Sequence, residues 1–187
     1  MSLKRLFVAV DLPDELADGL TLMQAGVPGA RWTDPDQMHV TLRFVGEVDG
    51  LVFRDVMAGL DEVEMQPFEV SLAGFGHFPP RGRPRSLWAG LGLPGLDELR
   101  ELKRAVDRAV NVRGVEVEHR KYVPHVTIAR LDETPTARVA RFLASHSLYR
   151  SEPFTVDAFH LYSSKLYHSG AIHTLEASYS LGDHEDL

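Results

Sequence analysis

The sequence HVTLRFVG begins at His39, and a near copy, HVTIARL, begins at His125. Hydrophobic and polar residues alternate in both copies, which is typical of a β-strand with one buried face. Alternate side chains of a strand share a face, so His39 lies on the same side as Thr41, and His125 on the same side as Thr127. Each strand therefore presents one imidazole and one hydroxyl, and its aliphatic residues point to a core.

The same alternation makes predictions for the residues that follow each motif. In the first strand, Arg43 is expected to share the face of His39, and Phe44 is expected to point into the core. In the second strand, Arg130 falls on the face opposite His125 unless the strand ends or bulges before it.

Predicted helices and strands surround the two motifs in the same order. Hydrophobic spacing and β-rich runs predict helices over residues 16–23, 52–63, 99–110 and 139–143, and strands over residues 5–12, 68–78, 86–93, 154–166 and 171–181. The order strand, helix, motif strand, helix, hairpin is followed by helix, motif strand, helix, hairpin, which is an internal pseudo-repeat. Helices mixed with mostly antiparallel strands predict an α+β fold.

The composition narrows the class of protein. With 187 residues, 44% hydrophobic and 25% charged, the chain is expected to form one globular domain without a membrane span. It has no cysteine, which excludes a thiol nucleophile and fits a cytoplasmic protein. A net charge of −7 argues against coating nucleic acid by bulk attraction, but it allows a local pocket for one or two phosphates.

Two imidazoles on separate strands favour acid–base chemistry. Imidazole can donate or accept a proton near neutral pH. Two of them in opposite protonation states can take a proton from water and give one to a leaving oxygen, as hydrolysis of a phosphodiester requires. Hydroxyl groups can hold the nonbridging oxygens. If either motif is considered alone, the alternative to acid–base chemistry is that its histidine merely faces solvent.

The paired motifs resemble those of the two-histidine phosphoesterase superfamily. The surrounding sequence is similar to bacterial and archaeal RNA 2′,3′-cyclic phosphodiesterases, also called 2′-5′ RNA ligases or LigT-like proteins, through RLFVAVDLP, ARWTDPDQMHVTLRFVGEV, RPRSLWAGL, YVPHVTIAR and FHLYSSKL. The resemblance implies a single bilobal domain over residues 1–187. It also implies two mostly antiparallel sheets flanking a central cleft, helices on the outside, and both termini in one lobe.

The resemblance further implies a role for each motif residue. His39 would be the general acid on the leaving O3′, and His125 the general base for water, so that the product carries a 2′-phosphate. Thr41 and Thr127 would bind phosphate oxygens. Arg130 matches the arginine that usually ends the second motif of the family, which makes it a candidate phosphate ligand. No cofactor and no metal are implied.

Four other features leave alternatives open. Arg43 stands where relatives often have lysine, so it is either a phosphate ligand or a solvated strand charge. His173 stands where relatives often have an aromatic residue, which puts a stacking role there in doubt. The basic loop 81–85, with Arg81, Arg83 and Arg85, and the pair Arg120 and Lys121 either guide an RNA backbone or are plain solvated charges.

The leading hypothesis is a metal-independent hydrolase of 2′,3′-cyclic phosphates on RNA ends or nucleotides, able in reverse to act as a 2′-5′ RNA ligase. One alternative is a binding module that holds a nucleotide or an RNA end without chemistry. A metal-dependent hydrolase is another, although no histidine pair has the spacing of a metal motif. We expect a cytoplasmic monomer with no membrane partner. The physiological substrate stays open between tRNA halves, small nucleotides and other cyclic phosphates.

Overall fold

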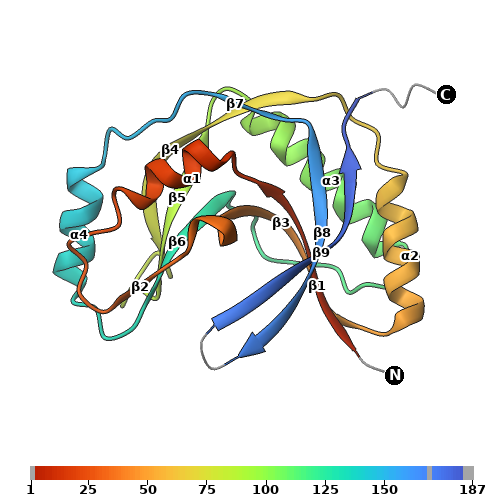
Figure 1. Cartoon of the computed structure of the whole chain (residues 1–187), viewed down its shortest axis with the longest axis horizontal. Coiled ribbons are helices and arrows are strands. Elements are labelled where there is room, and N and C mark those ends of the chain that lie inside the picture. The colour runs from red at the N-terminus through yellow and green to blue at the C-terminus, as the bar shows by residue number, and fades with distance from the viewer. Residues whose placement is uncertain (1–2, 168–169, 183–187) are drawn as a thin grey trace.

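The two motif strands lie side by side in the middle of one curled antiparallel sheet (Figure 1). The computed structural model describes residues 3–167 and 170–182. Within these ranges the sheet has nine strands: eight follow the order β7-β4-β5-β6-β3-β1-β8-β9, and the ninth, β2, pairs with β6. The strands are β1 (Lys4–Asp11), β2 (Ala30–Trp32), β3 (His39–Val48), β4 (Phe68–Phe78), β5 (Ser86–Gly92), β6 (His125–Leu131), β7 (Phe154–Val156), β8 (Ala158–Tyr167) and β9 (Gly170–Ser180).

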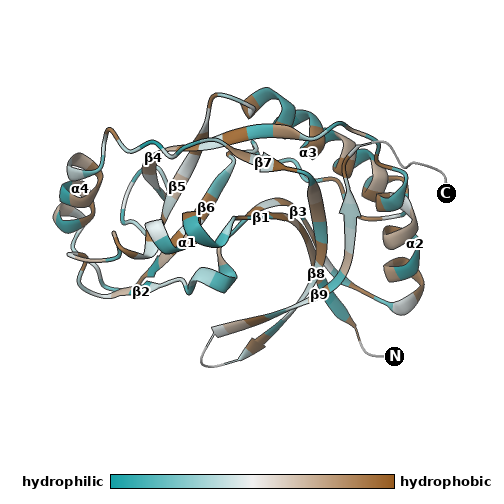
Figure 2. Cartoon of the chain, turned by 45° about the horizontal axis from the view of Figure 1, so that its top comes forward, coloured by the Kyte–Doolittle hydropathy of each residue, from teal (hydrophilic) through white to brown (hydrophobic). Residues whose placement is uncertain are grey.

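Helices pack along the sheet, and the predicted α+β class is confirmed. They are α1 (Asp14–Thr21), α2 (Gly50–Asp61), α3 (Leu96–Asn111) and α4 (Thr136–Ser145), with a short 3-10 helix over Pro35–Gln37. Helix α3 packs on β3 and β4, α2 packs on α3 and β9, and α4 packs on β4. In Figure 2, α2 and α4 carry both hydrophobic and hydrophilic residues, as helices with one buried side do.

The two sheets implied by the resemblance meet along β3 and β6, so that they form one sheet. The first strand, β1, and the last, β9, lie in the same half of this sheet, as the resemblance implies. Among the described residues, none of the helices has the length and hydrophobicity needed to cross a bilayer.

Local sequence signals explain why the helices beside the motif strands form. Asp49 caps α2, because its side-chain oxygen accepts hydrogen bonds from the backbone N–H groups of Leu51 and Val52. Helix α3 has a hydrophobic stripe at helical spacing that is fully buried, made of Leu99, Leu102, Val106 and Val110. Each such side chain contributes about 1.5–3 kcal/mol through burial. The stripe fixes α3 against the back of β3, and the motif side chains are left on the other face.

Candidate active site

The two histidines and the two threonines of the motifs lie on one face of the sheet. The central valines of the motifs are antiparallel register partners, and both are buried. This register puts His39 opposite Thr127 and Thr41 opposite His125 on adjacent strands. The histidines therefore occupy a diagonal, for which the Cα separation is about 7–8 Å. We call the side from which these four half-buried residues project the site face.

Each imidazole hydrogen-bonds to the backbone two residues before it. In His125, Nδ1–H donates to the carbonyl oxygen of Val123 at 2.6 Å. The ring of His39 bonds in the same way to the backbone of Gln37. A hydrogen bond at one ring nitrogen fixes the tautomer and the ring orientation. In His125 it leaves Nε2 as the nitrogen that can exchange a proton.

An aromatic cluster surrounds His39. Phe7 of β1 stacks on its ring with 5.0 Å between centroids, and His173 of β9 meets it edge-on at 5.6 Å. Burial is the main reason why the pKa of His39 falls to about 4; His173 lowers it too, whereas the bond to Gln37 and the carboxylate of Asp11 oppose the change. A phosphodiester anion beside this ring would raise its pKa, so substrate binding favours the protonated form.

A second aromatic pair surrounds His125. Phe78 meets its ring edge-on at 5.0 Å, and Trp88 lies tilted at 5.8 Å. The indole of Trp88 fits because Gly76 has no side chain: a Cβ there would lie 2.3 Å from the ring. Burial lowers the pKa of His125, and so does the charge of Arg130, whereas its backbone hydrogen bond raises it. A protonated His125 in turn lowers the pKa of His39, so the two rings interact electrostatically.

Each motif strand contains a β-bulge at the third residue after its histidine. In β3 the register against β1 skips Leu42, and in β6 the register against β5 skips Ile128. An extra residue shifts the alternation, so the side chains beyond it change face.

The bulge at Leu42 exchanges the faces of the next two residues, so the faces predicted for Arg43 and Phe44 are wrong. Arg43 is 1% exposed and points to the helices. Its guanidinium donates hydrogen bonds to a carboxylate, an amide oxygen and a carbonyl, which belong to Asp107, Asn111 and Glu116. Phe44 is 55% exposed and lies on the site face, with its ring centroid 6.2 Å from that of Phe7. Arg43 is therefore no longer a candidate phosphate ligand.

Because β6 bulges at Ile128, Arg130 comes to the same face as His125 and can reach the site. Arg130 lies on the site face, it is exposed, and its charge lowers the pKa of His125. Among the described residues, the hydroxyls of Thr41 and Thr127 have no hydrogen-bond partner in the protein. Two hydroxyls and a guanidinium, all hydrogen-bond donors, thus share the site face with the two imidazoles.

A pocket of about 240 Å³ lies beside His39 and carries negative charge. Its polar lining includes Asp11, Asp14 and Asp36. Tyr162 donates its hydroxyl to the carboxylate of Asp11 at 2.8 Å, and burial together with this bond raises the pKa of Tyr162. Sequence reasoning did not find this pocket, because its residues come from strands whose pairing the sequence does not show.

The remaining candidates are exposed basic residues in two loops. Arg81, Arg83 and Arg85 are exposed in the loop after β4, next to Phe78, and Arg120 and Lys121 are exposed before β6. Guidance of RNA by the loop stays a prediction. In the part of the chain that the structure describes, no group of three or more His, Asp and Glu residues is arranged to hold a metal ion.

Two imidazoles, two free hydroxyls and a guanidinium on one face of a sheet define a site of the phosphoester-cleaving class. A sequence profile described as "LigT like Phosphoesterase" matches residues 10–88 and 91–173. The chain belongs to the LigT-like phosphoesterase family, which confirms the resemblance.

Individual relatives agree with this assignment. The RNA 2′,3′-cyclic phosphodiesterase of Archaeoglobus fulgidus is 31% identical over 172 residues, which cover 90% of this chain and 96% of that protein. The protein of the same name from Thermus thermophilus is 33% identical over 190 residues, covering 96% and 92%. A crystal structure of a protein from Thermus thermophilus has a TM-score of 0.78 at 26% identity, covering 96% of this chain and 100% of that one.

Proposed function

We propose that this protein hydrolyses 2′,3′-cyclic phosphates on RNA ends or nucleotides to 2′-phosphomonoesters, with His39 and His125 as the acid–base pair. The observation that carries the proposal is the diagonal placement of the two imidazoles around two free hydroxyls on one face. The relatives named RNA 2′,3′-cyclic phosphodiesterase support the choice of substrate.

The chemical step needs one proton acceptor and one proton donor. Nε2 of His125 takes a proton from water while the water oxygen forms a bond to phosphorus. The bond between phosphorus and O3′ breaks, and protonated His39 gives its proton to the departing O3′. The phosphate stays attached through O2′. Each proton transfer typically contributes 10²–10⁴-fold to the rate.

Negative charge on the nonbridging oxygens is held by groups that are already in place. The hydroxyls of Thr41 and Thr127 donate hydrogen bonds to these oxygens, and Arg130 adds a positive charge on the side of His125. Donors that need no rearrangement stabilise a transition state most effectively.

We also propose that no metal ion takes part in this step, and that the reaction can run in reverse. A 5′-hydroxyl can take the place of water: His125 takes its proton while the 5′-oxygen bonds to phosphorus, the bond to O3′ breaks, and His39 protonates O3′, which leaves a 2′-5′ linkage. In the reverse of either step, His39 takes the proton of O3′, O3′ bonds to phosphorus, and the water or 5′-oxygen leaves with the proton that His125 returns. Both statements follow from the same pair of proton-transfer groups.

The experiment is turnover of a 2′,3′-cyclic nucleotide by pure protein in the presence of a chelator, with the product identified by phosphorus NMR. We expect a 2′-phosphate only. A 3′-phosphate product would contradict the assignment of O3′ as the leaving group, and loss of turnover with the chelator would contradict metal independence. Tight binding of the nucleotide without any product would point to a binding module instead.

A further inference from the structure

A second pocket on the site face has the opposite charge to the one beside His39. It has a volume of about 290 Å³ and is lined by Phe44, Arg5 and Arg120, together with Leu6 and Gly46. The bulge at Leu42 is what brings Phe44 to this face. Gly46 has a positive φ of 89°, which favours glycine, and it adds no side chain that could cover the ring.

Phe44 is unusual in this chain because its ring is uncovered. In residues 3–167 and 170–182, only Phe44 and Tyr167 among the aromatic residues are highly exposed, at 55% and 54%. An exposed aromatic ring in a groove that carries cations is the arrangement on which single-stranded nucleic acids stack their bases.

Two arginines stand next to this ring. Arg5 is exposed on the site face of β1, and it makes no side-chain hydrogen bond or ion pair within the described ranges. Its register partner is Glu47 of β3. The side chain of Arg120 is 84% exposed and pairs with Glu118 at 3.2 Å. Both guanidinium groups are accessible to a phosphate.

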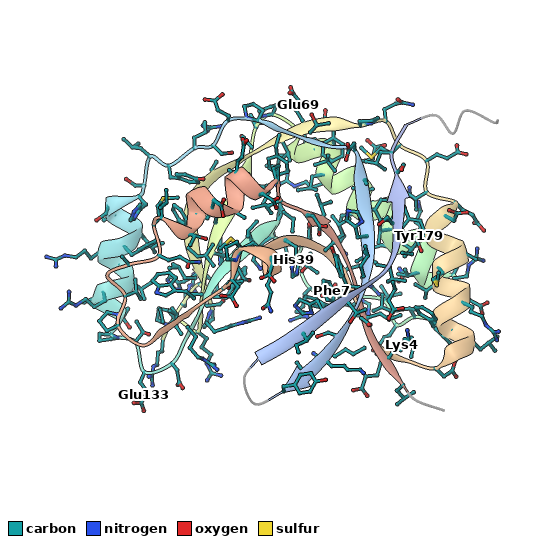
Figure 3. All side chains as sticks on the ribbon, in the orientation of Figure 1. Lys4, Phe7, His39, Glu69, Glu133 and Tyr179 are labelled. Carbon is teal, nitrogen blue, oxygen red and sulfur yellow. The ribbon has the colours of Figure 1, made fainter. Side chains whose placement is uncertain are left out.

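The pocket is close enough to the catalytic pair to hold part of the same substrate. Phe7 contacts both rings, at 5.0 Å from His39 and 6.2 Å from Phe44, so the latter two centroids are at most 11.2 Å apart, the sum of these distances. Figure 3 shows Phe7 beside His39, and Lys4, the neighbour of Arg5, further along the same strand. A short piece of RNA backbone can span this distance.

The charges of the two pockets indicate in which direction the bound RNA chain extends from the catalytic pair. The pocket at the other end of His39 is lined by Asp11, Asp14 and Asp36, which repel a phosphodiester chain. We propose that Phe44, Arg5 and Arg120 form a subsite for the nucleotide that precedes, on the 5′ side, the one carrying the cyclic phosphate. Its base stacks on Phe44, and its phosphate binds the two arginines. This inference rests on the proposed function, and it makes the 3′ end of an oligonucleotide the preferred substrate.

The test compares a 2′,3′-cyclic mononucleotide with a dinucleotide that ends in the same cyclic phosphate. We expect a higher kcat/KM for the dinucleotide, by about tenfold or more, because stacking on an aromatic ring has an effect of that size. In Phe44→Leu, the ratio of kcat/KM for the dinucleotide to kcat/KM for the mononucleotide is expected to fall close to one. Arg5→Gln lowers the ratio and makes the logarithm of kcat/KM for the dinucleotide depend less steeply on the logarithm of salt concentration.

Arg31→Gln is the matched control. Arg31 is also exposed, and it pairs in register with Arg130 at the opposite end of the site face, so this variant keeps the wild-type ratio. Equal kcat/KM for both substrates in the wild type, or loss of the ratio in Arg31→Gln, would overturn the subsite. Turnover of the mononucleotide tests the proposed function separately. If neither substrate is cleaved, weaker binding of a short single-stranded RNA by Phe44→Leu supports the subsite, and equal binding refutes it.

Discussion

Replacing Arg43 by methionine separates a structural role from a catalytic one. Alternation along β3 predicts Arg43 in the site, whereas the structure buries it behind the sheet against α3. Methionine keeps a flexible apolar side chain in the same space. It removes the donors to Asp107 at 3.3 Å, to Asn111 at 3.1 Å, and to the carbonyl of Glu116.

The expected loss in the free energy of unfolding depends on which other interactions each partner of Arg43 keeps. Asp107 retains Lys103, whose Nζ lies 2.6 Å from its carboxylate, so the ion pair is only partly lost. Asn111 is only partly buried and Glu116 is exposed, so water can replace part of what each loses, and each lost hydrogen bond to the guanidinium is expected to cost about 1–2 kcal/mol. We therefore expect Arg43→Met to lower the free energy of unfolding by about 2–4 kcal/mol, below the roughly 3–5 kcal/mol of a fully broken buried pair.

The assay is thermal unfolding together with kcat/KM for a 2′,3′-cyclic nucleotide. At roughly 2–4 °C per kcal/mol for a chain of this length, the Tm should fall by about 5–15 °C, with little change in kcat/KM well below the Tm. Arg100→Met is the control, because it breaks only an exposed pair with Asp97 and should cost about 1 kcal/mol or less. An unchanged Tm with kcat/KM reduced by about 10² or more would refute the structural reading and restore Arg43 as a phosphate ligand.

Three further predictions concern charge in the site. Because His173 lowers the pKa of His39, His173→Gln should raise that pKa in an NMR titration of the imidazole; an unchanged or lower value would contradict the coupling. Arg130→Met should lower kcat/KM by about 10² and, since Arg130 lowers the pKa of His125, should move the acid limb of the pH profile to higher pH. The folded pKa of His39, about 4, lies below the unfolded value of 6.5, so its contribution to stability is present above pH 6.5 and is lost as the pH falls toward 4. Urea unfolding should show a loss of about 2 kcal/mol from this group between pH 7 and pH 5, and His39→Gln should lack it.

The element order was predictable because its signals are local. Hydrophobic spacing marked α3, and the Gly- and Pro-rich loop after Phe78 marked the hairpin of β4 and β5. The pairing of His39 with Thr41, and of His125 with Thr127, also depends only on neighbours along one strand.

The faces of Arg43, Phe44 and Arg130 were not predictable in the same way. Each depends on a bulge, and a bulge is set by the register of the adjacent strand, β1 or β5. The contacts of Phe7 and His173 with His39 likewise cross from one strand to another, so no local pattern reports them. The strand order has to be known before these contacts can be found.

The pH dependence of kcat/KM in two single variants tests the central claim most directly. If His39 is the acid and His125 the base, the wild type gives a bell-shaped profile, and each variant is slower by about 10²–10⁴-fold. His39→Gln should lose the decrease at high pH, and His125→Gln should lose the decrease at low pH. If both variants keep the same bell, or if both lose the same limb, the two imidazoles do not work as an acid–base pair.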